Sequence, residues 1–438
     1  MKYPAKITKT YLFKLSVPIF FANLATPLVG IVDTSLLGHL NNVKYLAAAS
    51  IATSVISMIF WSFGFLRMGT TGLVSQSLGK GDYREIVVST IRNLSIAALI
   101  GVLILFVKYP VFSLIDSFFT ISDETSNLIK KYISVRLFSA PAELAMYVLV
   151  GLFIGIQKTK ISSFFVIFFS ISNIILSIYF VNHLNLDIFG VALGTVLSSY
   201  LTIFIFMIFT YFYIKKTFNI IPRYRKVFIA KKALMLFNMN FDLFIRTMLL
   251  TFSFLWFTYL SSELSEDYLA VNLVLLQFIV LASFFLDSYA FSTEGVVGFS
   301  LGRKVKKSFL LVVENSFKLS FFTGLIISVL YLIFYKQLIG ILTDLDYLKF
   351  LSYTFVVWVI IIPPIASLCY QYDGIFIGTS QTAEMRNAMI ISVASFIFVS
   401  IFLKNILGNH GLWLSLIVFM GLRSLMLKFY FHKILNKF

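Results

Sequence analysis

The stretch from Leu15 to Leu37 reads LSVPIFFANLATPLVGIVDTSLL and decides the class of fold. It is long enough to cross the hydrocarbon core of a bilayer as a helix, which needs about 20 apolar residues. Asp33 is its only charged residue. A carboxylate in a membrane costs about 2.5 to 3.5 kcal/mol on the insertion scale, so it is retained where it faces a cavity, a partner or an ion path. We therefore interpret Asp33 as a functional group in a transmembrane helix.

The composition of the whole chain agrees with this interpretation. The 438 residues are 59% hydrophobic and 13% charged, with a mean hydropathy of +0.93, which excludes an ordinary soluble enzyme. Apolar runs separated by short polar segments predict an all-α polytopic membrane protein with twelve transmembrane helices. We place these helices at residues 12–38, 46–78, 86–108, 127–156, 161–182, 188–214, 236–262, 268–301, 308–335, 350–379, 385–404 and 410–432.

The distribution of basic residues predicts the orientation of the chain. Its net charge is +17, and the Lys and Arg residues are concentrated on alternate loops. This pattern is typical of the cytoplasmic face of a membrane protein, so we expect both termini to be cytoplasmic and no nucleic acid to bind. The longest polar segment, Lys215 to Lys232, predicts a linker between two halves.

Two motifs recur at a single offset and relate the halves to each other. Gly151-Leu-Phe-Ile-Gly155 returns 223 residues later as Gly374-Ile-Phe-Ile-Gly378. The segment Gly72–Gly79 returns at the same offset as Gly295–Gly302. Gly-x-x-x-Gly can simply pack helices, but a shared offset favours an internal duplication. Since each repeat has an even number of crossings, the pseudo-two-fold axis is expected along the membrane normal, with the substrate path between the lobes.

The duplication predicts three parts: an N-lobe (1–214), a basic cytoplasmic linker (215–235) and a C-lobe (236–438). Two lobes in one chain can form a path without a second subunit, so we expect a monomer.

Absent motifs limit the chemistry. The sequence has no phosphate-binding loop, no histidines at metal-ligand spacing and no catalytic cluster that we can place, so neither an enzyme nor a bound cofactor or metal is expected. A membrane enzyme and a passive channel are the alternatives from other functional classes. The lone cysteine, Cys369, cannot form an internal disulfide.

The chain resembles the multidrug and toxic compound extrusion (MATE) family, and its DinF-like branch in particular. Motifs in both halves carry this resemblance: Pro18 through Asp33 to His39, Phe65–Gly72, Asp242 with Arg246, Leu286–Ala290 with Glu294, Tyr372–Gly378, Glu384–Asn387 and Gly408–His410. The resemblance implies a V-shaped, two-lobe exporter in the bacterial cytoplasmic (inner) membrane. It would exchange organic substrates for protons, or for sodium at Asp33, by alternating access.

The same resemblance implies roles for individual residues. Asp33 is implied as the coupling acid, with Asn173 and Thr195 as polar companions and Pro18 as a bend point of the first helix. Many DinF-like members carry a second acid four residues after the asparagine, where this chain has Ser177. The missing acid argues against a two-acid scheme and against a well-coordinated sodium site.

The C-lobe candidates are Arg246, Asp287, Glu294 and Asp373. We expect an ion-pair network that closes an inner gate, with a cation site behind it. Asp287 is the better candidate for function, because it should lie deeper in the membrane than Glu294 and Asp373, which are close to the cytoplasmic helix ends. Arg136 and Glu143, seven residues apart, share a helix face and are as compatible with a structural role as with a functional one.

The predicted function is export of small amphipathic or cationic organic compounds, coupled to a proton by one acid. Burial disfavours the charged form of a carboxylate, so a pH gradient can load and unload such a group. A lipid or lipid-linked oligosaccharide flippase of the same two-lobe superfamily is the alternative within transport.

Overall fold

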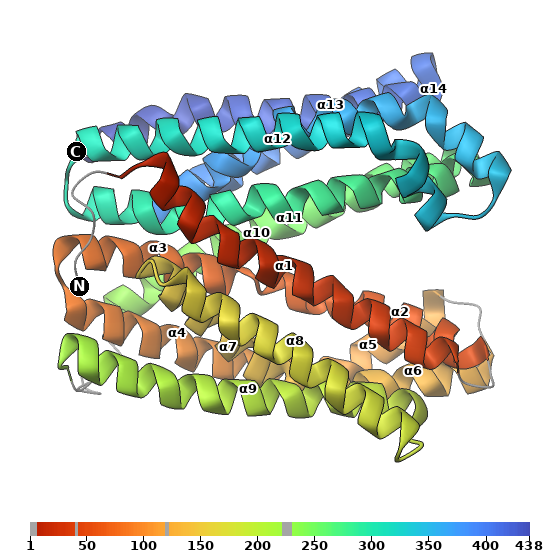
Figure 1. The fold of residues 1–438 in the computed structure, drawn as a ribbon, viewed down its shortest axis with the longest axis horizontal. Helices are drawn as coiled ribbons and strands as arrows, with labels where there is room; N and C mark the ends of the chain where they lie inside the picture. Colours follow the sequence, from red (N-terminus) through yellow and green to blue (C-terminus); the bar gives the residue numbers. More distant parts are fainter. Residues whose placement is uncertain (1–6, 40–42, 119–121, 221–229) are drawn as a thin grey trace. The chain divides into compact units, whose positions relative to one another are not determined.

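The computed structural model describes residues 7–39, 43–118, 122–220 and 230–438, which form helices and contain no strand (Figure 1). The helices are α1 (Lys9–Gly38), α2 (Val43–Ser62), α3 (Phe65–Lys80), α4 (Tyr83–Ile104), α5 (Lys108–Phe118), α6 (Asp123–Arg136), the 3₁₀ helix η1 (Leu137–Ser139), α7 (Ala140–Gly155), α8 (Thr159–Asn182), α9 (Asp187–Phe218), α10 (Ala230–Leu264), α11 (Glu266–Gly302), α12 (Lys306–Leu342), α13 (Asp346–Gly378) and α14 (Thr382–Leu435).

Twelve membrane crossings fit these helices. Within the described ranges, eleven helical segments are long and apolar enough to cross a membrane. One of them, α14, has 54 residues, and its backbone leaves helical geometry at Gly408, where φ is 57° and ψ is −133°. The parts before and after Gly408 correspond to the last two predicted helices, 385–404 and 410–432. The all-α, twelve-helix fold predicted from the sequence is therefore confirmed.

Two predicted helices are interrupted. The helix expected at 46–78 divides into α2 and α3 at residues 63–64, and the helix expected at 127–156 divides at η1. Pro141 in the first turn of α7 explains the second break. Proline has no N–H to donate and its ring clashes with the carbonyl four residues earlier, so α6 cannot continue into α7 without a change of geometry.

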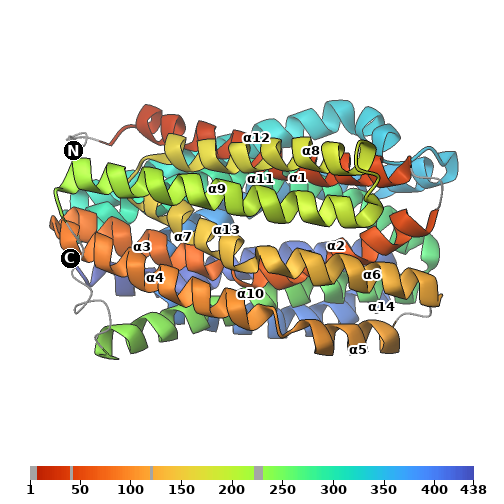
Figure 2. The same cartoon turned by 90° about the horizontal axis from the view of Figure 1, so that it is seen from below.

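The described helices form two compact units. Unit 1 contains Phe21–Leu236, and unit 2 contains Phe237–Phe438 together with residues 7–20, which include the first part of α1. In unit 1, α7 packs on α3 and α4, and α9 packs on α6 and α8 (Figure 2). In unit 2, α13 packs on α11, α12 and α14. Part of the predicted linker, residues 221–229, lies outside the described residues.

The first half of α1 makes its contacts inside unit 2. Ser16 Oγ lies 3.0 Å from Ser292 Oγ, and the Phe20 ring stacks on Phe285 with 4.1 Å between centroids. The backbone oxygen of Ile7 accepts a hydrogen bond from Asn315. At the same end of α12, Phe438 packs on Phe309. The first described residues and the last residue of the chain therefore lie at the same end of unit 2.

The repeated glycines make equivalent contacts in the two units. A Cβ atom on Gly151 would lie 2.5 Å from the backbone oxygen of Arg67, so α7 and α3 are in direct backbone contact. A Cβ atom on Gly374 would lie 2.6 Å from the backbone oxygen of Ala290, so α13 and α11 are packed in the same way. Arg67 and Ala290 are also 223 residues apart. The motifs thus pack helices and also mark the duplication.

We expect Gly378→Val to destabilise the protein by about 1–3 kcal/mol or more, because overpacking a tight contact forces the backbone to shift. A Cβ atom there would collide with the backbone oxygen of Glu294. Thermal unfolding in detergent measures the effect. The control is Gly421→Ala in α14, where a Cβ atom meets nothing within 4 Å. Equal stability of the two variants would contradict this account of the α11–α13 contact.

Candidate functional site

Asp33 lies in the second half of α1, in unit 1. Its residue surface is 8% exposed, and its Oδ1 atom is buried without a hydrogen-bond partner among the described residues. The Ser177 hydroxyl of α8 interacts with the carboxylate, and Arg136 of α6 acts on it electrostatically. A buried carboxylate with an unused oxygen is able to take up a proton or another cation.

Helix α8 places the side chains of Asn173 and Ser177 on one face, one turn apart. Ser177 Oγ donates to Asn173 Oδ1 at 3.3 Å, while Asn173 Nδ2 is buried and has no hydrogen-bond partner in the part of the chain that the structure describes. Both residues are fully buried. Helix α9 approaches closely here because its residue 194 is glycine: a Cβ atom on Gly194 would lie 2.9 Å from both the backbone nitrogen and Oγ of Ser177. The hydroxyl next to Asp33 is therefore held in place by two helices.

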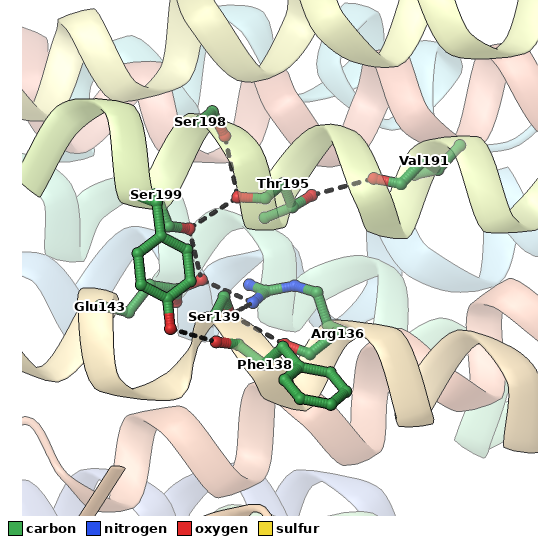
Figure 3. A network of polar contacts seen from close by, with 9 residues as sticks. Arg136, Phe138, Ser139, Glu143, Val191, Thr195, Ser198 and Ser199 are labelled. Atoms are coloured by element: carbon green, nitrogen blue, oxygen red, sulfur yellow. Dashed lines mark hydrogen bonds and ion pairs between the residues drawn. The ribbon is translucent and has the colours of Figure 1, made fainter. Parts of the chain in front are cut away.

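Thr195 follows this glycine on α9 and is 4% exposed. Its hydroxyl donates to the backbone oxygen of Val191 at 3.2 Å, and its own backbone oxygen accepts from Ser198 and Ser199 at 2.9 and 2.6 Å (Figure 3). These bonds use the hydroxyl proton of Thr195 within α9. Its oxygen lone pairs remain available as acceptors.

A buried ion pair lies beside these groups, at the break between α6 and α7. Arg136 Nη1 donates to Glu143 Oε1 at 2.5 Å and also to Ser139 Oγ (Figure 3). The Ser199 hydroxyl of α9, whose proton is used in the shorter bond to the Thr195 backbone oxygen, lies 3.4 Å from the same Glu143 oxygen. The side chains of Arg136 and Glu143 are 12% and 9% exposed. The helix break brings the two residues together across η1.

Aromatic residues surround the guanidinium group of Arg136. The Phe60 ring of α2 lies 4.9 Å from its Cζ atom, close enough for a cation–π contact. Tyr132, one turn earlier on α6, is buried and interacts electrostatically with both Arg136 and Asp33. We call Asp33, Tyr132, Arg136, Glu143, Asn173, Ser177, Thr195 and Ser199 the Asp33 cluster.

Unit 2 holds a second buried polar cluster. Asp373 of α13 accepts hydrogen bonds from Arg246 of α10 and from Arg423 of α14, the latter at 2.8 Å. These three side chains are at most 10% exposed. Nearby, Asp242 pairs with Arg386 at 2.5 Å and accepts from Thr382 at 3.0 Å. Each of these pairs joins two helices of unit 2; a role in an inner gate stays a prediction.

The remaining C-lobe candidates lie on α11. Glu294 is fully buried, and Asp287 is half-buried and acts electrostatically on Tyr370 of α13. Glu294 is thus more deeply buried than Asp287. The expectation of a cation site at these carboxylates stays a prediction.

Comparison with known families decides the identity of the fold. The model of the family described as MatE matches residues 18–179 and 243–406, which lie in both halves of the chain. The chain belongs to the MatE family. The resemblance found in the sequence is therefore confirmed, and members of this family are transporters rather than enzymes.

Relatives of this MatE chain include a protein that is named for multidrug export. DNA damage-inducible protein F of Escherichia coli (strain K12) is 32% identical over 95% of this chain and 90% of its own length. Multidrug export protein MepA of Staphylococcus haemolyticus (strain JCSC1435) is 25% identical over 44% of this chain and 43% of its own length. A solved structure of a multidrug resistance MATE family transporter in an outward-facing conformation superposes with a TM-score of 0.88. It is 16% identical and covers 98% of this chain and 96% of its own, which supports the fold.

Among the MatE positions taken from the sequence, the structure brings Asp33, Ser177 and Asn173 together in unit 1 and pairs Arg246 with Asp373 in unit 2. Pro18 lies within an uninterrupted helix from Lys9 to Gly38, two residues before the point where α1 passes from unit 2 to unit 1.

Arg423 was missed by the sequence reasoning. It is the only charged residue between Leu412 and Leu427, the same signal that identified Asp33. Lys428, five residues later, gives this position the appearance of the basic flank of a helix.

Proposed function

We propose that this chain exports amphipathic, often cationic, organic compounds from a bacterial cell in exchange for protons, by alternating access in the cytoplasmic membrane. Both termini would be cytoplasmic. Membership of a transporter family and relatives named for multidrug export support this proposal. Those names favour drug export over a lipid or lipid-linked oligosaccharide flippase.

The proposal depends on the hydroxyl group of Ser177, which lies between two hydrogen-bond acceptors, Asp33 and Asn173. Ser177 lies beside the Asp33 carboxylate and also donates to Asn173 Oδ1. A serine hydroxyl has one proton to donate. Ionised Asp33 competes for that proton strongly, because hydrogen bonds to charged acceptors are about twice as strong as neutral ones. Protonated Asp33 competes weakly and leaves the proton to Asn173.

The protonation state of Asp33 therefore changes how α1 is bonded to α8. A proton can shift a conformational equilibrium only by binding one state better than the other. We propose that ionised Asp33 favours the state that takes up substrate from the cell interior or the membrane. Protonation from outside then favours the state that releases it, with Pro18 as the bend point of α1.

One coupling acid makes the cycle electroneutral for a monovalent cationic substrate, since one proton enters for each positive charge that leaves. Such a cycle responds to the pH gradient and not to the membrane potential. With six crossings in each half of one chain, we propose that a monomer is sufficient.

Transport in proteoliposomes tests this function. The purified chain is reconstituted, and export of a fluorescent organic cation is followed with an imposed pH gradient, sodium gradient or potassium diffusion potential. We expect the pH gradient alone to drive transport. Export that follows the diffusion potential alone would contradict the electroneutral cycle, and equal flux without any gradient would identify a passive channel.

Ser177→Asp restores the acid that many DinF-like relatives carry. We expect two protons per cycle and export of a monovalent cation that responds to membrane potential, because one net charge then moves inward, with a driving force of about 2.3 kcal/mol per 100 mV. The measurement is the effect of a diffusion potential on export rate. Ser177→Asn, similar in size but neutral, is the control for crowding against Gly194. Potential-insensitive export by a folded Ser177→Asp variant would count against the single-acid account.

A further inference from the structure

The motif Gly408-Asn409-His410 lies at the break within α14 and has no part in the proton cycle described above. A Cβ atom on Gly411 would collide with the backbone oxygen of Leu403, so the two parts of α14 are in backbone contact at this break. In the proposed orientation, the break lies at the outer end of unit 2. The two side chains of the motif bind different helices.

Asn409 connects the break to α11. Its Nδ2 donates to Asn272 Oδ1 at 3.0 Å, and its Oδ1 accepts from Asn272 Nδ2 at 2.7 Å. Asn272 also donates to Ser261 of α10 at 2.8 Å and accepts from Trp413 at 2.8 Å. None of these side chains changes its charge at physiological pH. The break is therefore held on α10 and α11 by bonds that do not depend on pH.

His410 connects the break to α13. Trp358 Nε1 donates to His410 Nδ1 at 3.0 Å, and the ring centroids of Phe355 and His410 are 4.6 Å apart. An indole nitrogen can only donate, so Nδ1 must be the unprotonated nitrogen of a neutral imidazole. Since a protonated histidine carries a proton on both nitrogens, the bond to Trp358 exists only while His410 is neutral.

Two other histidines bond in the opposite sense. His39 Nδ1 lies 2.7 Å from the backbone oxygen of Ser35, and His432 Nδ1 lies 2.7 Å from that of Phe429. A carbonyl oxygen can only accept, so these nitrogens donate, and protonation preserves both bonds. Of the three, His410 is the one that loses its hydrogen bond when it gains a proton.

The surroundings of His410 allow it to titrate. The residue is half-buried, so water reaches it, and the Phe355 ring can attract a cation at this distance. Among the described residues, no charged side chain forms a hydrogen bond or ion pair with His410. Charged and titratable groups at this end of unit 2 contact other residues or are exposed: Glu263 of α10 pairs with Lys404 of α14, Asp267 of α11 with Tyr347 of α13, and Asp346 with Lys349 on α13, Tyr268 of α11 packs on Phe355, Lys336 of α12 lies over Tyr335 and Tyr353, and Glu266 and Asp344 are exposed.

The part of α14 after Gly408 has a second connection to α13, further along both helices. Arg423 donates to Asp373 at 2.8 Å. This ion pair does not involve His410. Loss of the bond between His410 and Trp358 therefore releases one end of the contact between the two helices and leaves the other end joined.

We propose that His410 is a sensor of external pH. While it is neutral, its bond to Trp358 holds the part of α14 after Gly408 against α13. An acidic exterior protonates His410, breaks this bond and lets the outer ends of the two helices separate, which favours substrate release. The inference rests on the proposed function, because the same external protons load Asp33. His410 is a positioning residue, since it does not receive the transported proton.

The emission of Trp358 tests the bond directly. The tryptophan emission of the purified full chain is followed between pH 5 and 8, where histidine changes its charge, and the emission of Trp358→Phe is subtracted. We expect the difference to follow a curve for one proton. In His410→Asn, Oδ1 takes the place of Nδ1 as an acceptor but does not titrate, so the curve should disappear. The matched control is His432→Asn, which should leave the curve unchanged.

Export gives a second readout, in proteoliposomes with a pH gradient of fixed size and a varied pH on the release side. His410→Asn keeps the bond in acid, so its export at pH 5 should be slower than wild type by about twofold to tenfold, the change that one hydrogen bond makes in an equilibrium constant. Trp358→Phe lacks the bond, so its export at pH 8 should be faster than wild type by about the same factor. A merely structural contact would slow both variants alike.

The outcomes separate this sensor from the proposed function. Asp33→Asn should be inactive in export and still show the Trp358 titration, because Asp33 and His410 lie in different units. Normal export by Asp33→Asn overturns the proposed function. A Trp358 signal that does not change between pH 5 and 8, or a titration that persists in folded His410→Asn, overturns the sensor. Should His410→Asn fail to fold, the difference between wild type and Trp358→Phe decides.

Discussion

Asp33→Asn is expected to reduce coupled export by about 100-fold or more, because without a titratable group the proton has no differential affinity with which to shift the two states. Asparagine has nearly the same size and resembles the protonated acid, so packing around α1 should be preserved. The residue is 8% exposed and lies beside Ser177. Export of a fluorescent cation from proteoliposomes under a pH gradient measures the loss.

The control for this variant is Asp116→Asn in α5, outside the candidate spans. Asp116 forms an ion pair with Lys130 at 2.6 Å, and its side chain is 49% exposed. We expect wild-type export from it, since exposed ion pairs contribute little. Both proteins are compared at equal amounts in the membrane and with equal elution profiles. Normal efflux by Asp33→Asn under these conditions would refute the role of Asp33.

Asp373→Asn is expected to be the most destabilising single change, at about 3–5 kcal/mol, because removing one partner of a buried ion pair leaves an uncompensated charge. In this case two arginines, Arg246 and Arg423, lose the same partner. The loss should appear as a lower unfolding temperature in detergent and less protein in the membrane.

A second substitution separates charge from packing at this site. Adding Arg423→Met to Asp373→Asn removes one of the two stranded charges, so stability should partly return. Asp346→Asn is the control on the same helix, because its side chain is 83% exposed and it pairs only with Lys349 three residues on. If Asp373→Asn unfolds at the wild-type temperature, the cluster does not stabilise unit 2.

The sequence alone predicted those features that are signalled by a single residue or by a repeated motif. A lone acid in an apolar run singled out Asp33, which is buried in the structure, and a repeated pair of glycines indicated the duplication. The structure adds that these glycines lie at the contacts of α7 with α3 and of α13 with α11. These signals are local or periodic. They follow from the cost of a charge in lipid and from the closeness that glycine permits between helices.

The partners of buried side chains could not be predicted in the same way. Arg246 and Asp373 are 127 residues apart and meet only because α10 and α13 pack together in unit 2. The spacing of Arg136 and Glu143 placed them on one face, but their contact depends on the turn of η1 between α6 and α7. Such contacts are tertiary, and periodicity carries no information about them.

The division of α1 has a consequence for synthesis of the protein. The ribosome makes α1 before Phe285 and Ser292, which contact the first half of α1 but are translated more than 250 residues later. The first half of α1 therefore lacks these contacts until α11 has been inserted into the membrane. A gene cut between α9 and α10 would yield a first fragment with this segment uncovered, and co-expression of the second fragment should protect it from degradation.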